Sequence, residues 1–277
     1  MSSITESQQG TILPGEPEGE MTRVGETEAY LYRAPAGSTN PRAVFLLSDI
    51  FGLPLKNCKI LADTISKRLR CDVWVPDLFA GSPTFRVHDL DGILPTKPGQ
   101  VVSYIGYLKL AVLVLRCGLW MYWNCGAVVD PRVETFIREV KEDKKYAKVG
   151  AVGYGFGASI CSRLSTKDVV LDTVVIVHPG RCTGLHTNAD IDDPVQIPTS
   201  WACAEDNFAF KPHMHLEAEA ILAGRKGTPE FNQYEFKEYK GTVHGFALRP
   251  HLADPEAKAA FEGALAQTVA WFEKTLV

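Results

Sequence analysis

The stretch that decides the fold is residues 148–164, KVGAVGYGFGASICSRL. Its opening residues form an apolar run typical of a buried strand, and its closing residues place Ile160, Cys161 and Leu164 at helical spacing. Between the two stands the turn Gly153-Tyr154-Gly155-Phe156-Gly157. A glycine-rich turn that leaves a strand and opens a helix is the context in which a G-x-nucleophile-x-G motif is found.

Short apolar runs alternate with amphipathic stretches on both sides of this turn. Further strands are predicted at residues 43–47, 71–75, 174–177, 199–203 and 234–239. Helices are predicted over residues 58–69, 133–140, 214–222 and 261–272, the last of them opened by Asp254 as N-cap and Pro255 at the first helical position. This alternation predicts an α/β domain with a doubly wound, mostly parallel sheet.

The composition is that of one globular domain. Of 277 residues, 45% are hydrophobic and 22% are charged, which excludes a disordered or collagen-like chain. The 29 basic and 33 acidic residues give a net charge of −4 without a long run of one sign, so we expect no nucleic-acid binding and a small molecule or a protein as partner. Polar residues 1–22 are expected to form a tail outside a single domain of residues 23–277.

The seven cysteines are scattered and show neither a CxxC pair nor histidines at metal-ligand spacing. We therefore expect free thiols in a reducing compartment, no bound metal and no cofactor. The first ten residues lack the basic and apolar regions of a secretory signal, which favours a cytoplasmic location.

Residues 94–130 interrupt the alternation, and residues 108–129 within them are strongly apolar. Lys109, Arg116 and Asn124 lie inside this run, and a central arginine disfavours a membrane span. We expect an apolar lid inserted between a strand and a helix, because such insertions commonly supply the substrate-binding walls of α/β enzymes. A homodimer interface is the alternative.

The central position of the turn, where an active motif carries serine or cysteine, is Gly155. Glycine adopts the positive φ that this turn needs without strain, so the turn can persist without a reacting side chain. A turn without any chemistry is one alternative. A dinucleotide-binding loop is another, because Gly153, Gly155 and Ala158 fit G-x-G-x-x-A and Asp172 follows, although a position in mid-chain argues against it.

Polar residues follow three other predicted strands, and together with the turn they follow the chain order of nucleophile, acid and histidine. His244 stands in a glycine-flanked loop after the last strand, where the general base of the motif would lie. Asp206 and Asn207 follow the strand at 199–203, where the carboxylate that orients the histidine belongs. Residues 48–52, SDIFG, follow the first parallel strand and would supply a second oxyanion N–H group.

Six spaced motifs together resemble the dienelactone hydrolase family of α/β-hydrolases, particularly its fungal members. The motifs are Asp49-Ile50-Phe51-Gly52, Pro76-Asp77-Leu78-Phe79-Ala80-Gly81, Gly153-Tyr154-Gly155-Phe156-Gly157, His178-Pro179-Gly180, Ala204-Glu205-Asp206-Asn207 and His244-Gly245-Phe246. The resemblance runs from about Leu13 to the C-terminus. It implies an α/β-hydrolase fold and the cleavage of lactone or related ester bonds by a Cys-Asp-His triad.

The resemblance also implies roles for single residues. The nucleophile position falls on Gly155 and the base on His244. The triad acid falls on either Asp206 or Asn207. The acid that influences the thiol in relatives falls on Asp49.

The substrate-binding groups follow in the same way. The backbone N–H groups of Ile50 and Phe156 would stabilise an oxyanion. Arg249 would bind a substrate carboxylate, and Tyr154 is counted among the substrate-binding residues.

Loss of a triad nucleophile costs on the order of a millionfold in kcat in subtilisin, so covalent ester hydrolysis is disfavoured. We expect non-hydrolytic acid/base chemistry by His244: isomerisation, elimination or cyclisation of a small oxygenated, lactone- or polyketide-like metabolite. Three alternatives stay open. The first is a hydrolase with an activated water or a relocated nucleophile such as Cys161 or Cys182. The others are an inactive module that binds a small molecule or a protein, and a plain hydrolase in which Gly155 is an introduced substitution.

Overall fold

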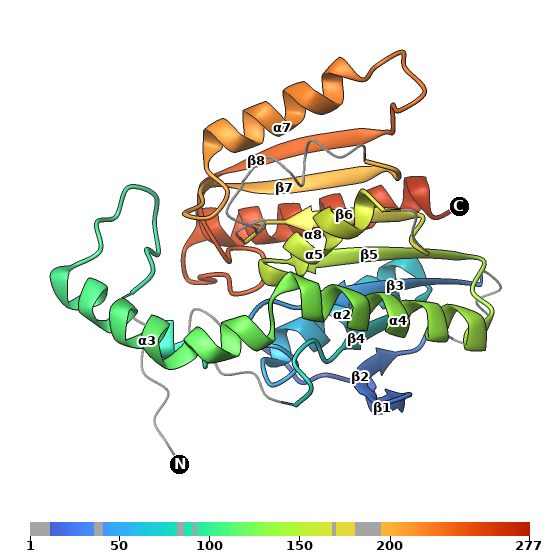
Figure 1. Ribbon diagram of the computed structural model, residues 1–277, viewed down its shortest axis with the longest axis horizontal. Helices are drawn as coiled ribbons and strands as arrows, with labels where there is room; N and C mark the ends of the chain where they lie inside the picture. Colours follow the sequence, from blue (N-terminus) through green and yellow to red (C-terminus); the bar gives the residue numbers. More distant parts are fainter. Residues whose placement is uncertain (1–11, 36–40, 82–85, 91–92, 168–169, 181–194) are drawn as a thin grey trace.

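The chain folds around one eight-stranded sheet, seen in a computed structural model that describes residues 12–35, 41–81, 86–90, 93–167, 170–180 and 195–277 (Figure 1). The strands are β1 (Glu20–Val24), β2 (Thr27–Tyr32), β3 (Arg42–Leu47), β4 (Asp72–Pro76), β5 (Lys148–Tyr154), β6 (Thr173–Val177), β7 (Thr199–Asp206) and β8 (Tyr234–Val243). Their order in the sheet is β1-β2-β4-β3-β5-β6-β7-β8. β2 runs antiparallel to β1 and β4, and the strands from β4 to β8 in this order are parallel.

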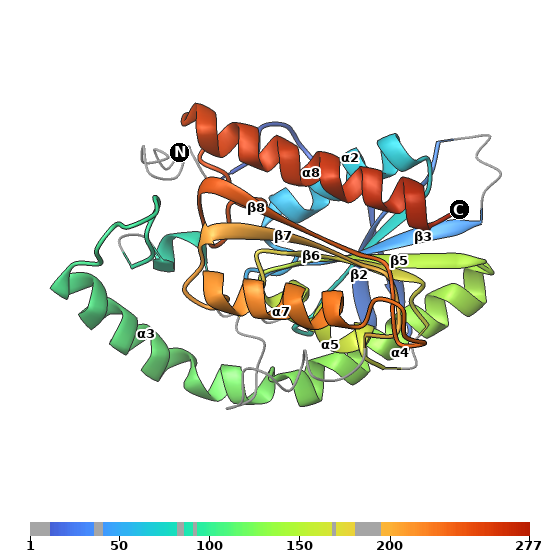
Figure 2. The ribbon, with the colours of Figure 1, turned by 90° about the horizontal axis from the view of Figure 1, so that it is seen from above.

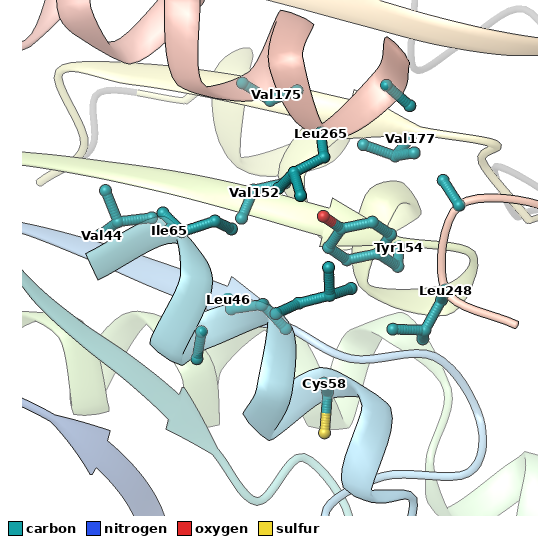
Figure 3. Close-up of a cluster of buried hydrophobic side chains, with 14 of the residues drawn as sticks. Val44, Leu46, Cys58, Ile65, Val152, Tyr154, Val175, Val177, Leu248 and Leu265 are labelled. Carbon is teal, nitrogen blue, oxygen red and sulfur yellow. The ribbon is translucent and has the colours of Figure 1, made fainter. Parts of the chain in front are cut away.

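Helices cover both faces of this sheet (Figure 2). They are α2 (Lys56–Leu69), α3 (Tyr104–Trp123), α4 (Gly126–Lys144), α5 (Phe156–Ser165), α7 (Pro212–Gly224) and α8 (Pro255–Thr275), with a short 3-10 helix η1 (Val87–Leu90). α2 and α8 lie on one face, and α4, α5 and α7 lie on the other (Figure 2). Each face has its own apolar layer. In the first layer, Ile65 of α2 and Leu265 of α8 lie over Val44, Val152 and Val175 of the sheet (Figure 3).

The predicted α/β-hydrolase fold with a mostly parallel sheet is confirmed. Each predicted strand is present, although β7 and β8 continue beyond their expected ends to Asp206 and Val243. The predicted N-cap of α8 is also present, since the side chain of Asp254 accepts from the N–H groups of Glu256 (3.0 Å) and Ala257 (3.4 Å). β1 and β2 are additions that the sequence did not predict. β1 is a short edge strand with few apolar residues, and β2, which lies between β1 and β4, has only a three-residue buried run, Ala29 to Leu31.

Residues 12–22 were expected to belong to a polar tail, and instead they pack on the domain. Leu13 is buried, and its N–H donates to Asn57 Oδ1 (2.9 Å). The N–H of Glu18 donates to Asp63 Oδ2 (2.7 Å). Because β1 begins at Glu20, the expected boundary after residue 22 falls inside a strand. The few apolar residues of this polar stretch, Ile12, Leu13 and Met21, have no periodicity that could have revealed this packing.

The insertion at residues 94–130 leaves most of its apolar helix exposed. Its helix α3 extends away from the sheet (Figure 1), and only Gly106, Leu113 and Cys117 of α3 are buried. Residues 126–130 are the first turn of α4 and belong to the body of the domain. Among the described residues, α3 is the one helix that is long and apolar enough to cross a membrane, by length and composition alone.

The loops that leave β3, β5, β6, β7 and β8 meet at one edge of the sheet, because these strands are parallel neighbours. These loops carry, in chain order, Asp49, Gly155, His178, Asn207 and His244. In open α/β sheets, ligand sites form at this carboxyl edge. Five loops from five different strands therefore assemble one candidate site.

Candidate active site

The turn at Gly155 has the backbone shape of a sharp strand-to-helix elbow. Gly155 is the N-cap of α5, with φ 52° and ψ −105°, and its N–H donates to Val177 O (3.1 Å). The outer glycines permit close packing, since a Cβ on Gly153 would lie 2.2 Å from Gly157 O and a Cβ on Gly157 would lie 2.1 Å from Leu47 O. The start of α5 can therefore lie directly against the end of β3.

Three side chains lie around the position that the Cβ of a side chain at residue 155 would occupy. A Cβ on Gly155 would lie 3.3 Å from Asp49 Cβ, 3.5 Å from His244 Nε2 and 3.8 Å from His178 Cε1. The fold thus brings His244, from the loop after β8, to the glycine of the elbow. A ring nitrogen of His244 is the polar atom nearest to the position that a reacting side chain would occupy.

The second ring nitrogen of His244, Nδ1, lies 3.2 Å from Asn207 Oδ1. The amide orientation of Asn207 follows from its other contacts. Its Oδ1 accepts from the N–H groups of Ala209 (2.9 Å) and Phe210 (3.2 Å), and its Nδ2 donates to Pro179 O (3.0 Å). Because Oδ1 can only accept, Nδ1 of His244 carries the proton, and Nε2 presents a lone pair to the turn.

Asp206 is not the group that orients His244. It is a half-buried residue at the end of β7, and its Oδ2 accepts from the N–H of Gly99 (3.1 Å) in the insertion. The sequence left the acid position open between Asp206 and Asn207, and the structure places Asn207 against the histidine. Side chains of neighbouring residues leave an extended chain on opposite sides, so a shift of one residue decides which of them reaches the ring.

The surroundings of His244 favour the neutral imidazole. Burial is the main cause that lowers the pKa of His244 from 6.5 to about 3, and the positive charge of Arg249 adds to it. The ring of Phe208 packs on His244 with 4.8 Å between centroids. Asn207 carries no charge that would stabilise an imidazolium. His244 is therefore an unprotonated base over the physiological pH range.

We expect His244 to make the free energy of unfolding fall as the pH decreases from about 6.5 towards 3. In this window the unfolded chain binds a proton at His244 that the folded chain does not, so stability rises with pH. The wild type should lose about 3 kcal/mol more than His244→Gln between pH 7 and pH 4. Urea unfolding of both proteins at several pH values measures this difference. If the free energy of unfolding depended on pH in the same way in both proteins, His244 would not be a buried, neutral histidine.

Asp49 and Arg249 form a buried ion pair beside the turn. Arg249 Nε lies 3.4 Å from Asp49 Oδ2, and its guanidinium lies 4.7 Å from the ring centroid of Phe51. Asp49 Oδ1 accepts from the N–H of Phe51 (3.0 Å). Burial raises the pKa of Asp49 to about 6, against the opposing effect of Arg249. This carboxyl group can therefore hold or release a proton close to neutral pH.

His178 is a site residue to which the sequence assigned no function, although its motif was noticed. It is fully buried, and neither ring nitrogen has a hydrogen-bond partner among the residues that the structure describes. Its ring meets that of His244 edge-on with 5.1 Å between centroids. Its φ of +35° is rare for a residue other than glycine. Burial, with His244 and Arg249 nearby, holds the pKa of His178 well below its usual range. The signals that could have placed it at the site were its position after β6 and the motif His178-Pro179-Gly180.

Two backbone N–H groups were expected to stabilise an oxyanion, and their residues, Ile50 and Phe156, follow β3 and β5 at this edge of the sheet. Phe156 is the first residue of α5, so its N–H has no acceptor within the helix. Ile50 lies next to Asp49 in the loop after β3. The ring of Phe156 packs against Phe79, with 5.4 Å between centroids, and Phe79 packs against Trp120 of α3 at 4.9 Å. A row of three aromatic rings therefore leads from the residue after Gly155 to α3.

Tyr154 was expected to bind substrate and instead belongs to the core. It is 2% exposed and lies in the apolar layer beneath α8 (Figure 3). Burial raises the pKa of its hydroxyl above the usual range. Successive side chains of a strand point to opposite faces, and the last residue of β5 points into the sheet layer rather than towards the turn.

Neither Cys161 nor Asp172 supplies a reacting group at the turn. Cys161 is fully buried in the layer around α5, and burial raises the pKa of its thiol. Cys182 lies outside the described residues. Asp172 lies at the opposite end of β5, where its Oδ2 accepts from the N–H of Val149 (2.8 Å), so a dinucleotide site does not assemble. No three His, Cys, Asp or Glu side chains in the described part of the chain could hold a metal ion.

Comparison with known proteins agrees with this architecture. The sequence model of the dienelactone hydrolase family matches residues 118–276. Hydrolase pyvD of Aspergillus violaceofuscus is 31% identical over 100% of this chain and 99% of that protein, and hydrolase tropI of Talaromyces stipitatus is 28% identical over 96% and 94%. In three dimensions, a dienelactone hydrolase-like promiscuous phosphotriesterase from metagenomic libraries matches with a TM-score of 0.67 at 14% identity, over 94% of this chain and 99% of that one. The chain therefore belongs to the dienelactone hydrolase family.

Proposed function

We propose that this protein is an enzyme on the dienelactone hydrolase scaffold that works without a covalent nucleophile. His244 would move a proton on a small oxygenated, lactone- or polyketide-like metabolite, in an isomerisation, elimination or cyclisation. The observation that carries the proposal is the neutral His244, whose Nε2 lies 3.5 Å from where a Cβ of Gly155 would be. A base that faces a glycine has no side chain to activate, so it can act on the substrate itself.

The proton transfer can be written from these groups. Nε2 of His244 takes a proton from a carbon next to a substrate carbonyl, and the electron pair moves onto the carbonyl oxygen. The N–H groups of Ile50 and Phe156 would stabilise the enolate that forms. The imidazolium then returns its proton to a different carbon in an isomerisation, or to a leaving oxygen in an elimination. Asn207 Oδ1 keeps the ring orientation fixed through Nδ1.

The low pKa of His244 has a consequence for such a step. In the free protein the ring is a weak base because its charged form is poorly stabilised. A developing enolate brings a negative charge beside the ring, which stabilises the imidazolium only as the reaction proceeds. An interaction that strengthens in the transition state raises the rate rather than the affinity. Arg249 would hold a substrate carboxylate on the same side, at the cost of its contact with Asp49.

A second candidate is hydrolysis by a water molecule that His244 activates. The same geometry favours it, because a water beside Gly155 would lie within reach of Nε2 and of a carbonyl carbon. The two candidates differ in the atoms that reach the product. Hydrolysis adds a solvent oxygen, whereas isomerisation, elimination and cyclisation do not.

Isotope labelling separates these reactions. The wild type is incubated with a panel of unsaturated five- and six-membered lactones and their open hydroxy acids, once in D2O and once in H2¹⁸O, and products are analysed by mass spectrometry. We expect a product without ¹⁸O in every case. An isomerisation would also place deuterium from D2O on carbon, whereas an elimination would yield an unsaturated product without such a label. A product carboxylate that contains ¹⁸O, formed by the wild type and not by His244→Gln, would contradict the proposal and support the activated water.

A further inference from the structure

Most of the apolar surface of helix α3 is exposed and is not covered by other described parts of the domain. Twelve of its 20 residues are large apolar side chains that stay exposed, among them Leu108 (67%), Leu115 (83%) and Leu119 (77%). The helix extends from the body of the domain in both views (Figures 1 and 2). Soluble monomers rarely expose a continuous apolar patch of this kind, so this surface is expected to have an occupant.

The exposed side chains form a continuous arc around the helix. At 100° per residue, the buried Gly106, Leu113 and Cys117 lie within one narrow strip, where Leu113 and Cys117 pack with Ile93. The exposed apolar side chains cover roughly 220° of the circumference outside that strip. One packed helix covers roughly 100° of its neighbour, so the helix of a second copy would leave about half of the arc in water. A lipid phase surrounds the whole arc.

Charge and aromatic residues on α3 follow the pattern of a helix at a membrane surface. Residues 104–123 contain no acidic residue, and both cations, Lys109 and Arg116, lie on the same border of the apolar arc. Arg116 also pairs with Asp89 (3.0 Å), whereas the Lys109 side chain is exposed. Tyr104 and Trp123 mark the two ends, where aromatic rings are favoured at lipid–water boundaries. Cations beside an apolar face complement anionic lipid headgroups.

The attachment of α3 excludes a membrane span in this fold. Before the helix, Lys97 pairs with Asp254 (2.9 Å), and the N–H of Gly99 donates to Asp206 Oδ2 (3.1 Å). At its other end Trp120 packs on Phe79. Both ends are therefore held to the same domain on the same side, and the helix can only lie along a membrane surface.

We propose that α3 inserts its exposed apolar arc into the surface of an anionic lipid membrane and holds the domain there. The insertion would be in the plane of the membrane, with Lys109 and Arg116 at the headgroups. Trp120, Phe79 and Phe156 connect the helix to the residue that follows Gly155, so the bound domain would present its carboxyl edge near the lipid.

Sedimentation of the full chain with sucrose-loaded vesicles tests this proposal. One set of vesicles contains phosphatidylcholine and phosphatidylserine at 7:3, and the other contains phosphatidylcholine alone. We expect the wild type to bind the anionic vesicles. The triple variant Leu108→Gln/Leu115→Gln/Leu119→Gln should lower the partition coefficient at least ~30-fold. Lys109→Gln should lower binding to the anionic vesicles about fivefold and leave binding to the neutral ones unchanged.

The matched control is Leu216→Gln, which replaces an exposed leucine of α7 and should bind as the wild type does. Circular dichroism of each variant verifies that it is folded. Absence of wild-type binding to both kinds of vesicle would overturn the proposal, as would equal binding by the folded triple variant. A dimer seen by analytical ultracentrifugation that the triple variant abolishes, without vesicle binding, would show instead that a second copy covers α3.

Discussion

Gly155→Cys is expected to create an ester hydrolase, with turnover of p-nitrophenyl acetate at least ~10³-fold above that of the wild type. The new Cβ would lie 3.5 Å from His244 Nε2, which can take the thiol proton. The N–H groups of Ile50 and Phe156 are the proposed donors to the oxyanion. A Cys-His-Asn arrangement is sufficient in papain-like proteases, so Asn207 need not prevent this gain. Spectrophotometric release of nitrophenolate measures it.

Gly155→Ala is the matched control for this gain. It introduces the same Cβ at a φ of +52°, with the same close contact of 3.3 Å to Asp49 Cβ, so it carries the same strain of about 1–3 kcal/mol without a thiol. Alkylation with iodoacetamide should abolish the activity of the cysteine variant. A folded Gly155→Cys protein that is no more active than Gly155→Ala would show that the elbow, His244 and the oxyanion donors are not aligned for catalysis.

Gly157→Ala is expected to destabilise the protein by about 3 kcal/mol or more. Its Cβ would lie 2.1 Å from Leu47 O and 2.5 Å from Leu47 C, both backbone atoms that no side-chain rotation can move. The start of α5 would have to move away from β3, which also breaks the hydrogen bond from Gly157 N–H to Ser48 O (3.0 Å). Urea denaturation followed by circular dichroism gives the change in the free energy of unfolding.

The control for this substitution is Gly224→Ala in α7, where a Cβ would meet no atom within 4 Å and φ is not positive. Alanine there should leave stability unchanged or raise it by up to about 1 kcal/mol. If Gly157→Ala and Gly224→Ala both unfolded at the same urea concentration as the wild type, the start of α5 could not lie as close to β3 as the structure shows.

Local patterns were enough to predict most of the fold. The strands that pack between two helical layers are continuous apolar runs, and such runs can be detected without knowledge of the structure. The turn that opens α5 was predicted from Gly153, Gly155 and Gly157, because the steric reason for these glycines is local. β1 and the packing of Leu13 could not be predicted, since neither has a periodic pattern.

The sequence predicted most of the candidate site. It did not decide which residue orients His244, and it assigned no function to His178. The order of loops along the chain placed His244 and Asp49 at the turn, but only three-dimensional geometry distinguishes Asn207 from Asp206. His178 was not predicted as a site residue because its burial and its contact with the ring of His244 depend on residues far apart in the sequence. The exposure of α3 could not be predicted either, because an apolar helix has the same sequence whether it covers a site or extends from the domain.

The proposed function requires a proton-transferring His244 at a turn that carries no nucleophile. The most direct test is the turnover number of His244→Gln on whichever lactone of the panel the wild type converts, compared with His213→Gln, an exposed histidine of α7. We predict a fall of at least ~100-fold for His244→Gln, wild-type turnover for His213→Gln, and no effect of thiol alkylation on the wild type. Undiminished turnover by a folded His244→Gln protein would contradict the proposed function.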